Sequence, residues 1–268
     1  MGLKDQLAGV LPADVVPFVS DRFEVIGDIA VLAIPAELEP YKHRIAQAVI
    51  ARRKNIVTVL NKKEKVSGGS RTARYEILLG ESTVTVHRES GFRYRLDVSR
   101  AFFSTRMAHE RARVTSRIRP GERVFIPFAG AGPFVIPSAA RGAEVYAMEN
   151  NPDAFRFLSE NAELNHVFGN CHLILGDALD NTLLAHLKFD RIIIPAPYGM
   201  DHALETILPL LAPGGTVHFY TFSADEEITG LIAAYERCGL SVRYAAPCGN
   251  VAPGISRRVF DMVRPLPP

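Results

Sequence analysis

The pattern of apolar and polar positions changes near the turn Arg119-Pro120-Gly121, which divides the chain into two parts. Before this turn, short runs rich in β-branched and aromatic residues predict strands. Apolar positions at spacings of three and four predict one helix from Ala36 to Lys54 and a second from about Thr105 to Ile118. The predicted strands cover Phe23 to Ile34, Asn55 to Leu60, Arg74 to Gly80, Ser82 to Glu89 and Phe92 to Val98.

The segments LLGES and RESGF, centred on Gly80 and Gly91, are typical of hairpin turns between such strands. The part before Pro120 is therefore expected to be a small mixed α/β domain with antiparallel pairs.

After Pro120, strands and helices alternate, which predicts a mainly parallel sheet covered on both faces. Between two of the strands, a helix from Asn151 to Asn165 is expected to bury one apolar face. Ligands are then expected at the carboxyl ends of the strands. The predicted strands are Arg123 to Pro127, Glu144 to Met148, His172 to Leu175, Arg191 to Ile194, Gly215 to Phe222, Leu240 to Tyr244 and Arg258 to Val263.

Composition narrows the class of protein. The chain has 268 residues, is 47% hydrophobic and carries a net charge of +2, so it is expected to be globular. Three widely spaced cysteines predict neither a disulfide framework nor a metal site, and no apolar run is long enough to cross a membrane. A cytoplasmic monomer is the expectation. Basic residues gather in Ala51 to Lys65 and Ser104 to Arg119, either as solvated helix faces or as a nucleic-acid surface.

A glycine turn follows the first strand after Pro120. The sequence FAGAGPF places Gly130 and Gly132 between strand and helix, and Glu149 ends the next strand. Such a turn lets a ligand approach the backbone, and the acid can accept hydrogen bonds from ribose hydroxyls. A purely structural glycine turn is the alternative, but this order of elements favours a nucleoside cofactor.

The residues around the turn favour one nucleoside over another. Val135 stands where a dinucleotide fingerprint has its third glycine, and Pro133 is expected in the first helical turn, where it removes a donor for a pyrophosphate. S-adenosylmethionine has no pyrophosphate, so neither the missing third glycine nor Pro133 disfavours its binding. Asp177, after the third strand, can reach the adenine amino group; its alternative role is a helix N-cap.

The fourth strand runs into the segment PAPY, Pro195 to Tyr198. A planar base can stack on Tyr198 while the exposed carbonyls of Pro195 and Ala196 accept hydrogen bonds from its nitrogens, as for a flipped nucleotide. The alternative is a turn that packs Tyr198 into the core. Methyltransferases acting on nitrogens have a related motif here, with Pro-Pro before an aromatic residue, and Ala196 replaces one of those prolines.

Taken together, these segments resemble the archaeal and eukaryotic enzymes that modify the guanine at position 37 of tRNA, by N1-methylation or, in wybutosine synthesis, by aminocarboxypropyl transfer from the same cofactor. The resemblance covers nearly the whole chain and rests on Phe23 to Pro35, Phe102 to Val114, Pro127 to Pro137 and Glu149 to Asn165. It implies a Rossmann-like class I methyltransferase sheet preceded by a small α/β domain. The implied divisions are an RNA-side domain at 1–100, a linking helix at 101–119 and an S-adenosylmethionine domain at 120–268.

The resemblance also implies roles for single residues. Glu110 is the expected base that removes the guanine proton, and Arg71 or Arg74 is expected to stabilise charge on O6. The alternative for Glu110 is an ion pair with Arg113 one helical turn away. Catalytic residues are thus Glu110, Arg71, Pro195, Pro197 and Tyr198; cofactor residues are Phe128, Ala129, Gly130, Gly132, Phe134, Glu149, Asn150, Asp177 and Ala178; tRNA contacts are Lys62, Lys63, Arg106, Arg111 and Arg113, with Lys65, Arg117 and Arg119 nearby.

Two branches of the family remain open. Ala36 to Gln47 and Val251 to Gly254 resemble the aminocarboxypropyl branch, whereas Gly132-Pro133-Phe134 and Arg106 before Glu110-Arg111 resemble the methylating branch. That branch carries Asn-Leu-Pro where this chain has Pro195-Ala196-Pro197. The proline-rich segment favours methyl transfer. A small-molecule methyltransferase and a binding module without activity are the alternatives from other classes.

Overall fold

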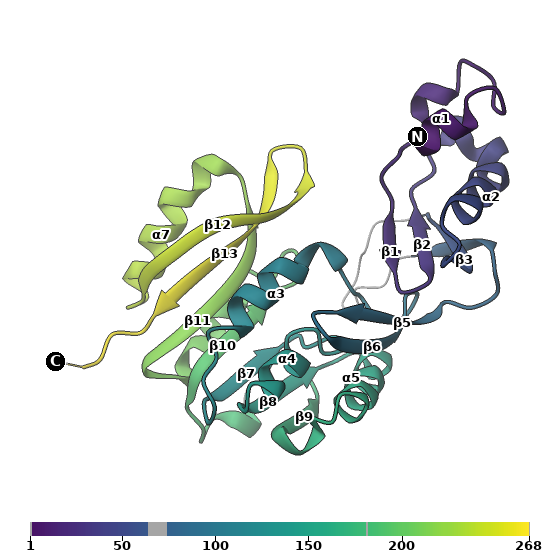
Figure 1. Ribbon diagram of the computed structural model, residues 1–268. Helices are drawn as coiled ribbons and strands as arrows, with labels where there is room; N and C mark the ends of the chain where they lie inside the picture. The colour runs from purple at the N-terminus through teal and green to yellow at the C-terminus, as the bar shows by residue number, and fades with distance from the viewer. Residues whose placement is uncertain (1, 64–73, 181, 268) are drawn as a thin grey trace. The chain divides into compact units, whose positions relative to one another are not determined.

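The computed structural model describes residues 2–63, 74–180 and 182–267, and these form two compact units (Figure 1). The N-terminal unit extends through Thr105 and the C-terminal unit begins at Arg106. The helix expected across this boundary is a 3₁₀ turn, Thr105–Met107, followed by α3 (Ala108–Thr115). Buried Val114 and Thr115 anchor α3 in the C-terminal unit.

The N-terminal unit contains a four-stranded sheet and a separate hairpin. The sheet has the order β1 (Glu24–Ile26), β2 (Ile29–Leu32), β3 (Thr58–Lys62) and β4 (Tyr75–Leu79), and the hairpin consists of β5 (Val84–Glu89) and β6 (Phe92–Asp97). Strands β2 and β3 are parallel because the connection between them contains α2 (Lys42–Arg52). A short helix, α1 (Leu3–Leu7), completes the unit.

Two expectations for the N-terminal unit need correction. The RESGF turn joins β5 to β6 as predicted, but LLGES is not a hairpin turn, because β4 pairs with β3 and β5 pairs with β6. The helix expected from Ala36 begins instead as a 3₁₀ segment, Ala36–Tyr41. Pro40 lies inside this segment and cannot donate a backbone hydrogen bond, so the α-helix starts only at Lys42.

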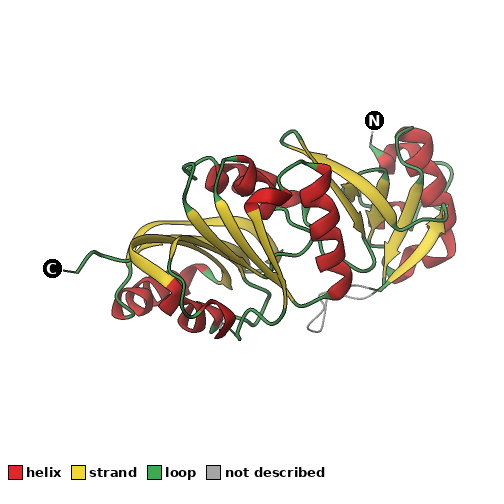
Figure 2. Cartoon of the chain, turned by 90° about the horizontal axis from the view of Figure 1, so that it is seen from below, coloured by secondary structure: helices red, strands yellow, loops and turns green. Residues whose placement is uncertain are grey.

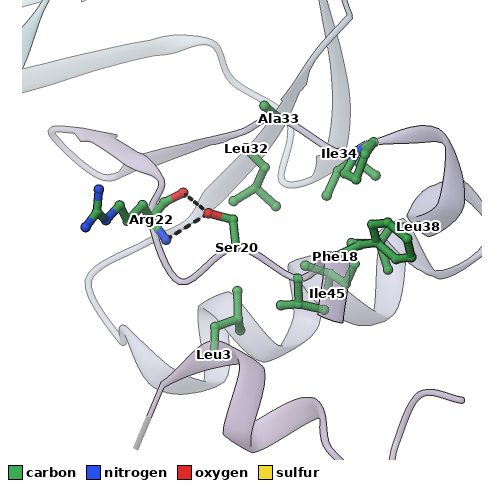
Figure 3. Close-up of a pocket in the computed structure, with 11 residues that line it drawn as sticks. Leu3, Phe18, Ser20, Arg22, Leu32, Ala33, Ile34, Leu38 and Ile45 are labelled. Atoms are coloured by element: carbon green, nitrogen blue, oxygen red, sulfur yellow. Dashed lines mark hydrogen bonds between the residues drawn. The ribbon is translucent and has the colours of Figure 1, made fainter. Parts of the chain in front are cut away.

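A small apolar pocket lies inside the N-terminal unit (Figure 3). Its walls come from α1, β2 and α2, through Leu3, Leu32 and Ile45, and the Ser20 hydroxyl beside it donates to the Arg22 carbonyl. The volume of about 20 Å³ holds no more than a single water molecule. This pocket contains none of the expected cofactor residues.

The C-terminal unit is a seven-stranded sheet with helices on both faces (Figures 1 and 2). Its strand order is β12-β13-β11-β10-β7-β8-β9, and only β13 runs against the others. The seven strands predicted from the sequence are confirmed, with several of them longer. They are β7 (Arg123–Pro127), β8 (Glu144–Glu149), β9 (Cys171–Leu175), β10 (Phe189–Pro195), β11 (Leu211–Ser223), β12 (Ser241–Ala252) and β13 (Ile255–Val263).

The helices of this unit are α4 (Val135–Ala140), α5 (Pro152–Leu164), α6 (Ala203–Ile207) and α7 (Ile228–Arg237), besides α3. On one face of the sheet, Tyr235 of α7 contacts the rings of Phe219 and Phe260. On the other face, α3 reaches β11 and β13 through Glu110 and Arg113. The core is therefore closed on both sides, as the alternation of strands and helices predicted.

The strand order places two loops of interest together. The chain starts at β7, moves outward through β8 and β9, and then returns to pair β10 against the other edge of β7. Strand order reverses at this point, which is where doubly wound sheets bind their ligands. The glycine turn follows β7, and Pro195 to Tyr198 follows β10.

Candidate functional site

The loop after β7 is tied to the end of β8 by Glu149. Its backbone has positive φ at Phe128 (53°), Gly130 (57°) and Gly132 (93°). The Gly130 amide donates to Glu149 Oε2 at 2.7 Å, and the Asn151 amide donates to Oε1 at 2.9 Å. A carboxylate has about four acceptor positions, so Glu149 can still accept two hydroxyl hydrogens.

Gly132 provides the close packing that the missing third glycine would give. A Cβ built on Gly132 would lie 2.8 Å from Cδ1 of Leu158 on α5, a distance that real side chains do not show. Asn161, also on α5 and fully buried, donates from Nδ2 to the Ala131 carbonyl at 2.9 Å. The sequence reasoning missed Asn161, although a polar residue on an apolar helix face was a signal for it.

The first turn of α4 is poorly suited to a pyrophosphate. The expectation for Pro133 was wrong in position: α4 begins at Val135, with Phe134 as N-cap, so Pro133 precedes the helix. Pro137 is the third helical residue and also lacks an amide hydrogen. A six-residue helix with this proline offers few donors for phosphates, whereas Glu149 offers acceptors for a ribose. The donor set therefore fits S-adenosylmethionine.

The remaining expected cofactor residues lie around this loop. Asp177, exposed, accepts from the Leu179 amide at 3.0 Å in a local turn and caps no helix, while Ala178 is buried beside it. Asn150 is exposed directly after Glu149. In the loop itself, Ala129 is buried and Phe128 is partly exposed.

Tyr198 is presented to solvent at the carboxyl edge of the sheet. Strand β10 ends at Pro195, and 75% of Tyr198 is exposed, so the alternative that packs this ring into the core is wrong. One edge of the ring meets Phe222 of β11, with centroids 5.2 Å apart. A second planar ring can therefore approach Tyr198. Ala196 is buried between the partly exposed Pro195 and Pro197.

Glu110 lies in α3 and is 7% exposed. Arg113 donates to both of its carboxylate oxygens, from Nε at 2.8 Å and Nη2 at 2.6 Å, so the ion pair named as the alternative is present. The Tyr220 hydroxyl also donates to Glu110 Oε1, at 3.0 Å. The Tyr220 ring in turn contacts Phe134 of the glycine loop, with centroids 5.5 Å apart. Glu110 is thus linked to the glycine loop after β7 through one aromatic ring.

The contacts of Glu110 and Tyr198 meet on one face of β11. Tyr220 and Phe222 are two residues apart and therefore project from the same side of this strand, about 7 Å apart. Glu110 bonds to the first and Tyr198 contacts the second. Two candidate residues that are 88 positions apart in the sequence thus contact neighbouring side chains on the same face of β11.

Glu110 is connected through Arg113 to a buried cluster of charged residues. Asp261 of β13 accepts from Arg113 Nη1 and from Arg117 Nη1, each at 2.6 Å, and lies 2.6 Å from His218 Nδ1. His218 Nε2 lies 2.7 Å from Arg191 Nη1, which can only donate, so the proton of the neutral ring belongs on Nδ1. Burial lowers the pKa of His218, consistent with the neutral ring.

The pKa of Asp261 is lowered in this cluster. Burial would raise the pKa, but the hydrogen bonds from His218 and Arg113 outweigh it. The pKa of Arg113 is raised, since its bonds to Glu110 and Asp261 exceed the cost of burial. The Asp261 side chain is only 4% exposed, so its negative charge is held in place by Arg113.

The basic residues expected to contact tRNA divide into two groups. Arg106 is exposed, whereas Arg111 is 3% exposed and Arg113 uses its donors on Glu110 and Asp261. Arg111 is buried and the donors of Arg113 are used within the protein, so the structure adds no support to the prediction that these two contact tRNA, which stays a prediction. The remaining expected contacts lie in the N-terminal unit: Lys62 is partly exposed, Lys63 pairs with Glu39 and Glu76, and Arg71 and Lys65 lie outside the described residues.

We expect Gly132→Ala to weaken cofactor binding about tenfold, because the loop must shift to relieve the contact with Leu158. The matched control is Gly121→Ala, which has a similar positive φ (81°) but meets no atom within 4 Å. Both variants carry the left-handed backbone penalty of about 1 kcal/mol. Calorimetric titration with S-adenosylhomocysteine should separate them, and equal affinities would contradict a positioning role for Gly132.

The part of the chain that the structure describes contains no group of three or more metal-ligating side chains placed to hold an ion. None of the helices in the described ranges is long and apolar enough to cross a membrane.

Comparison with known families gives two matches that together span most of the chain. A model of the TRM5/TYW2 methyltransferase domain matches residues 85–238. A model of the TYW2 N-terminal domain matches residues 3–83.

Individual relatives come from both branches. The chain is 38% identical over 221 residues to tRNA (guanine(37)-N(1))-methyltransferase Trm5b of Pyrococcus abyssi, covering 82% of this chain and 66% of that protein. It is 42% identical over 219 residues to tRNA(Phe) (4-demethylwyosine(37)-C(7)) aminocarboxypropyltransferase of Pyrococcus horikoshii, covering 81% and 77%. The crystal structure of P. horikoshii TYW2 in complex with MeSAdo superposes with a TM-score of 0.79 at 30% identity, over 97% of both chains.

Proposed function

Because the chain belongs to the TRM5/TYW2 methyltransferase family, we propose that it transfers the methyl group of S-adenosylmethionine to N1 of the guanine at position 37 of tRNA. The observation that carries this proposal is the meeting of Glu110 and Tyr198 on one face of β11, beside the cofactor loop. An aromatic ring can hold a flipped guanine by stacking, and a carboxylate can accept its proton.

The chain binds S-adenosylmethionine through the loop after β7 and the ends of β8 and β9. When bound, this cofactor supplies a sulfonium whose attached carbon is electrophilic. Glu149 accepts hydrogen bonds from the ribose hydroxyls, and Asp177 accepts from the adenine amino group. The positive φ values at Gly130 and Gly132 let the backbone approach the nucleoside.

Glu110 accepts the N1 proton of guanine as the new bond forms. Arg113 donates to both carboxylate oxygens and so fixes the plane of the carboxylate, and the Tyr220 hydroxyl donates to Oε1. Because the N1–H becomes more acidic while the bond forms, a carboxylate in an ion pair is a sufficient base. The acceptor nitrogen must lie in line with the departing thioether, and Tyr198 provides this alignment by stacking on the base.

The carbonyls after β10 fix the edge of the guanine. Backbone oxygens at Pro195 and Ala196 accept from its exocyclic amino group, and Pro197 directs the chain outward to Tyr198. The methylating branch has an asparagine in this segment, and no side chain of the segment Pro195-Ala196-Pro197 replaces that amide.

Incubation with labelled S-adenosylmethionine and unmodified tRNA, followed by mass analysis of the nucleoside at position 37, tests the proposal. A methyl increment on guanine supports it. An increment on a small molecule alone, in the absence of RNA, would contradict it.

Aminocarboxypropyl transfer is the second candidate, favoured by the TYW2 N-terminal match over residues 3–83. In that reaction the other carbon–sulfur bond breaks and methylthioadenosine is released. The test supplies tRNA that carries the tricyclic base. An aminocarboxypropyl mass increment on that base would support this second reaction and contradict methyl transfer.

We expect tRNA binding to weaken steeply with salt. Each phosphate neutralised by residues such as Arg106 and Lys62 contributes a slope of about −0.7 in log K against log salt for single-stranded RNA. Electrophoretic titrations between low and physiological salt measure this slope. A flat response would exclude these phosphate contacts, while binding of S-adenosylhomocysteine serves as the control that salt does not unfold the protein.

A further inference from the structure

Arg257 is a partly buried cation without an anionic partner. It lies in β13 directly opposite Phe222 of β11, and its guanidinium carbon is 5.1 Å from the centre of that ring. Within the described residues its guanidinium forms neither a hydrogen bond nor an ion pair. Its neighbour Arg258, by contrast, pairs with Asp225, and Arg113 pairs with two carboxylates.

The surroundings of Arg257 disfavour its charge. Burial lowers the pKa of Arg257, and the positive charges of Arg111 and Arg106 lower it further. Arginine stays protonated in proteins, so the chain keeps a cation that nothing in the described part neutralises. Stacking on Phe222 offsets little of the cost of burying this charge. An external anion is the partner that this arrangement lacks.

The position of Arg257 indicates which anion it meets. Opposite residues on paired strands share a face, so Arg257 projects on the same side as Phe222 and Tyr220. Phe222 lies between Arg257 and Tyr198, because its ring contacts both. Three strand spacings, about 14 Å, separate β13 from β7 and its cofactor loop. The anion therefore belongs to the molecule that stacks on Tyr198 and not to the cofactor's carboxylate.

We propose that Arg257 binds a backbone phosphate adjacent to the nucleotide whose base stacks on Tyr198. This subsite rests on the proposed function, because it requires an RNA substrate. Exposed Arg106, whose charge acts on Arg257, extends the positive surface along the RNA backbone. Arg257 acts as a positioning residue: with the phosphate fixed, the base can reach Tyr198 and Glu110.

The test uses full-length tRNA with a single neutral methylphosphonate linkage on one or the other side of nucleotide 37. With wild-type protein, one of the two replacements is expected to lower kcat/KM about tenfold, the size of a charge-assisted hydrogen bond. Arg257→Gln is expected to lower kcat/KM equally on normal tRNA and to be insensitive to that same replacement. A double-mutant cycle of this kind isolates the contact between the two groups.

Arg243→Gln is the matched control, because Arg243 is an exposed arginine of the neighbouring strand β12. It should keep the wild-type sensitivity to both linkages. S-adenosylhomocysteine affinity should be unchanged in both variants. If Arg257→Gln retains the wild-type sensitivity, or loses cofactor affinity instead, the phosphate subsite is overturned. If the wild-type protein transfers no group to any tRNA, the proposed function fails and the subsite fails with it.

Discussion

Replacing Glu110 with glutamine is expected to lower the rate of group transfer at saturating cofactor by about 10²- to 10⁴-fold, the usual contribution of a positioned general base. Glutamine keeps the size of the side chain and can still accept from the Tyr220 hydroxyl, but it cannot take the N1 proton. The measurement is a single-turnover assay with enzyme in excess over tRNA.

Two further measurements separate a base from a structural residue. Glutamine weakens the pair with Arg113, so the thermal midpoint and the S-adenosylhomocysteine affinity of the variant must be measured as well. Glu236→Gln, at an exposed position of α7, makes the same chemical change and is expected to alter neither the thermal midpoint nor the S-adenosylhomocysteine affinity. A base predicts lost turnover with retained cofactor affinity. Full turnover in Glu110→Gln would remove Glu110 from the chemistry.

Asp261→Asn is expected to destabilise the C-terminal unit by about 3 kcal/mol or more, because it removes a buried negative charge that pairs with Arg113 and His218. Among the described contacts, Glu110 and Glu122 are the other carboxylates of this cluster. The buried guanidinium of Arg113 then keeps a single carboxylate partner. Urea unfolding followed by far-ultraviolet circular dichroism measures the loss. Asp14→Asn, at an exposed position of the N-terminal unit, is the control for the same substitution.

The pH dependence of this effect has a definite sign. The folded pKa of Asp261 is lowered, so its contribution to stability is complete above the unfolded value of about 3.9 and is lost as pH falls toward the folded pKa. The stability difference between wild type and Asp261→Asn should therefore be constant near neutral pH and shrink below about pH 4. A difference that grows on acidification would contradict the cluster as described.

Local sequence signals predicted the C-terminal sheet well. The bounds of β7 were predicted to the residue, because a short apolar run between a Pro-Gly turn and a glycine turn leaves little choice. The same local reasoning failed at LLGES, since a turn sequence reports a reversal of the chain but not which strand will pair with β4. It also misplaced Pro133 relative to α4, because helix starts depend on the packing of the loop before them.

The sequence by itself determined the order of strands and helices, the glycine turn with its acid at Glu149, and the resemblance to the family, because each depends on residues close together along the chain. Only the tertiary structure decided the surroundings of Glu110, Tyr198 and Arg257. Tyr220 and Phe222 of β11 contact Glu110 and Tyr198, and Arg257 of β13 reaches Phe222 because β13 pairs with β11. Burial and charge depend on such long-range contacts, and for this reason the pairing of Arg113 with both Glu110 and Asp261 could not be read from the sequence.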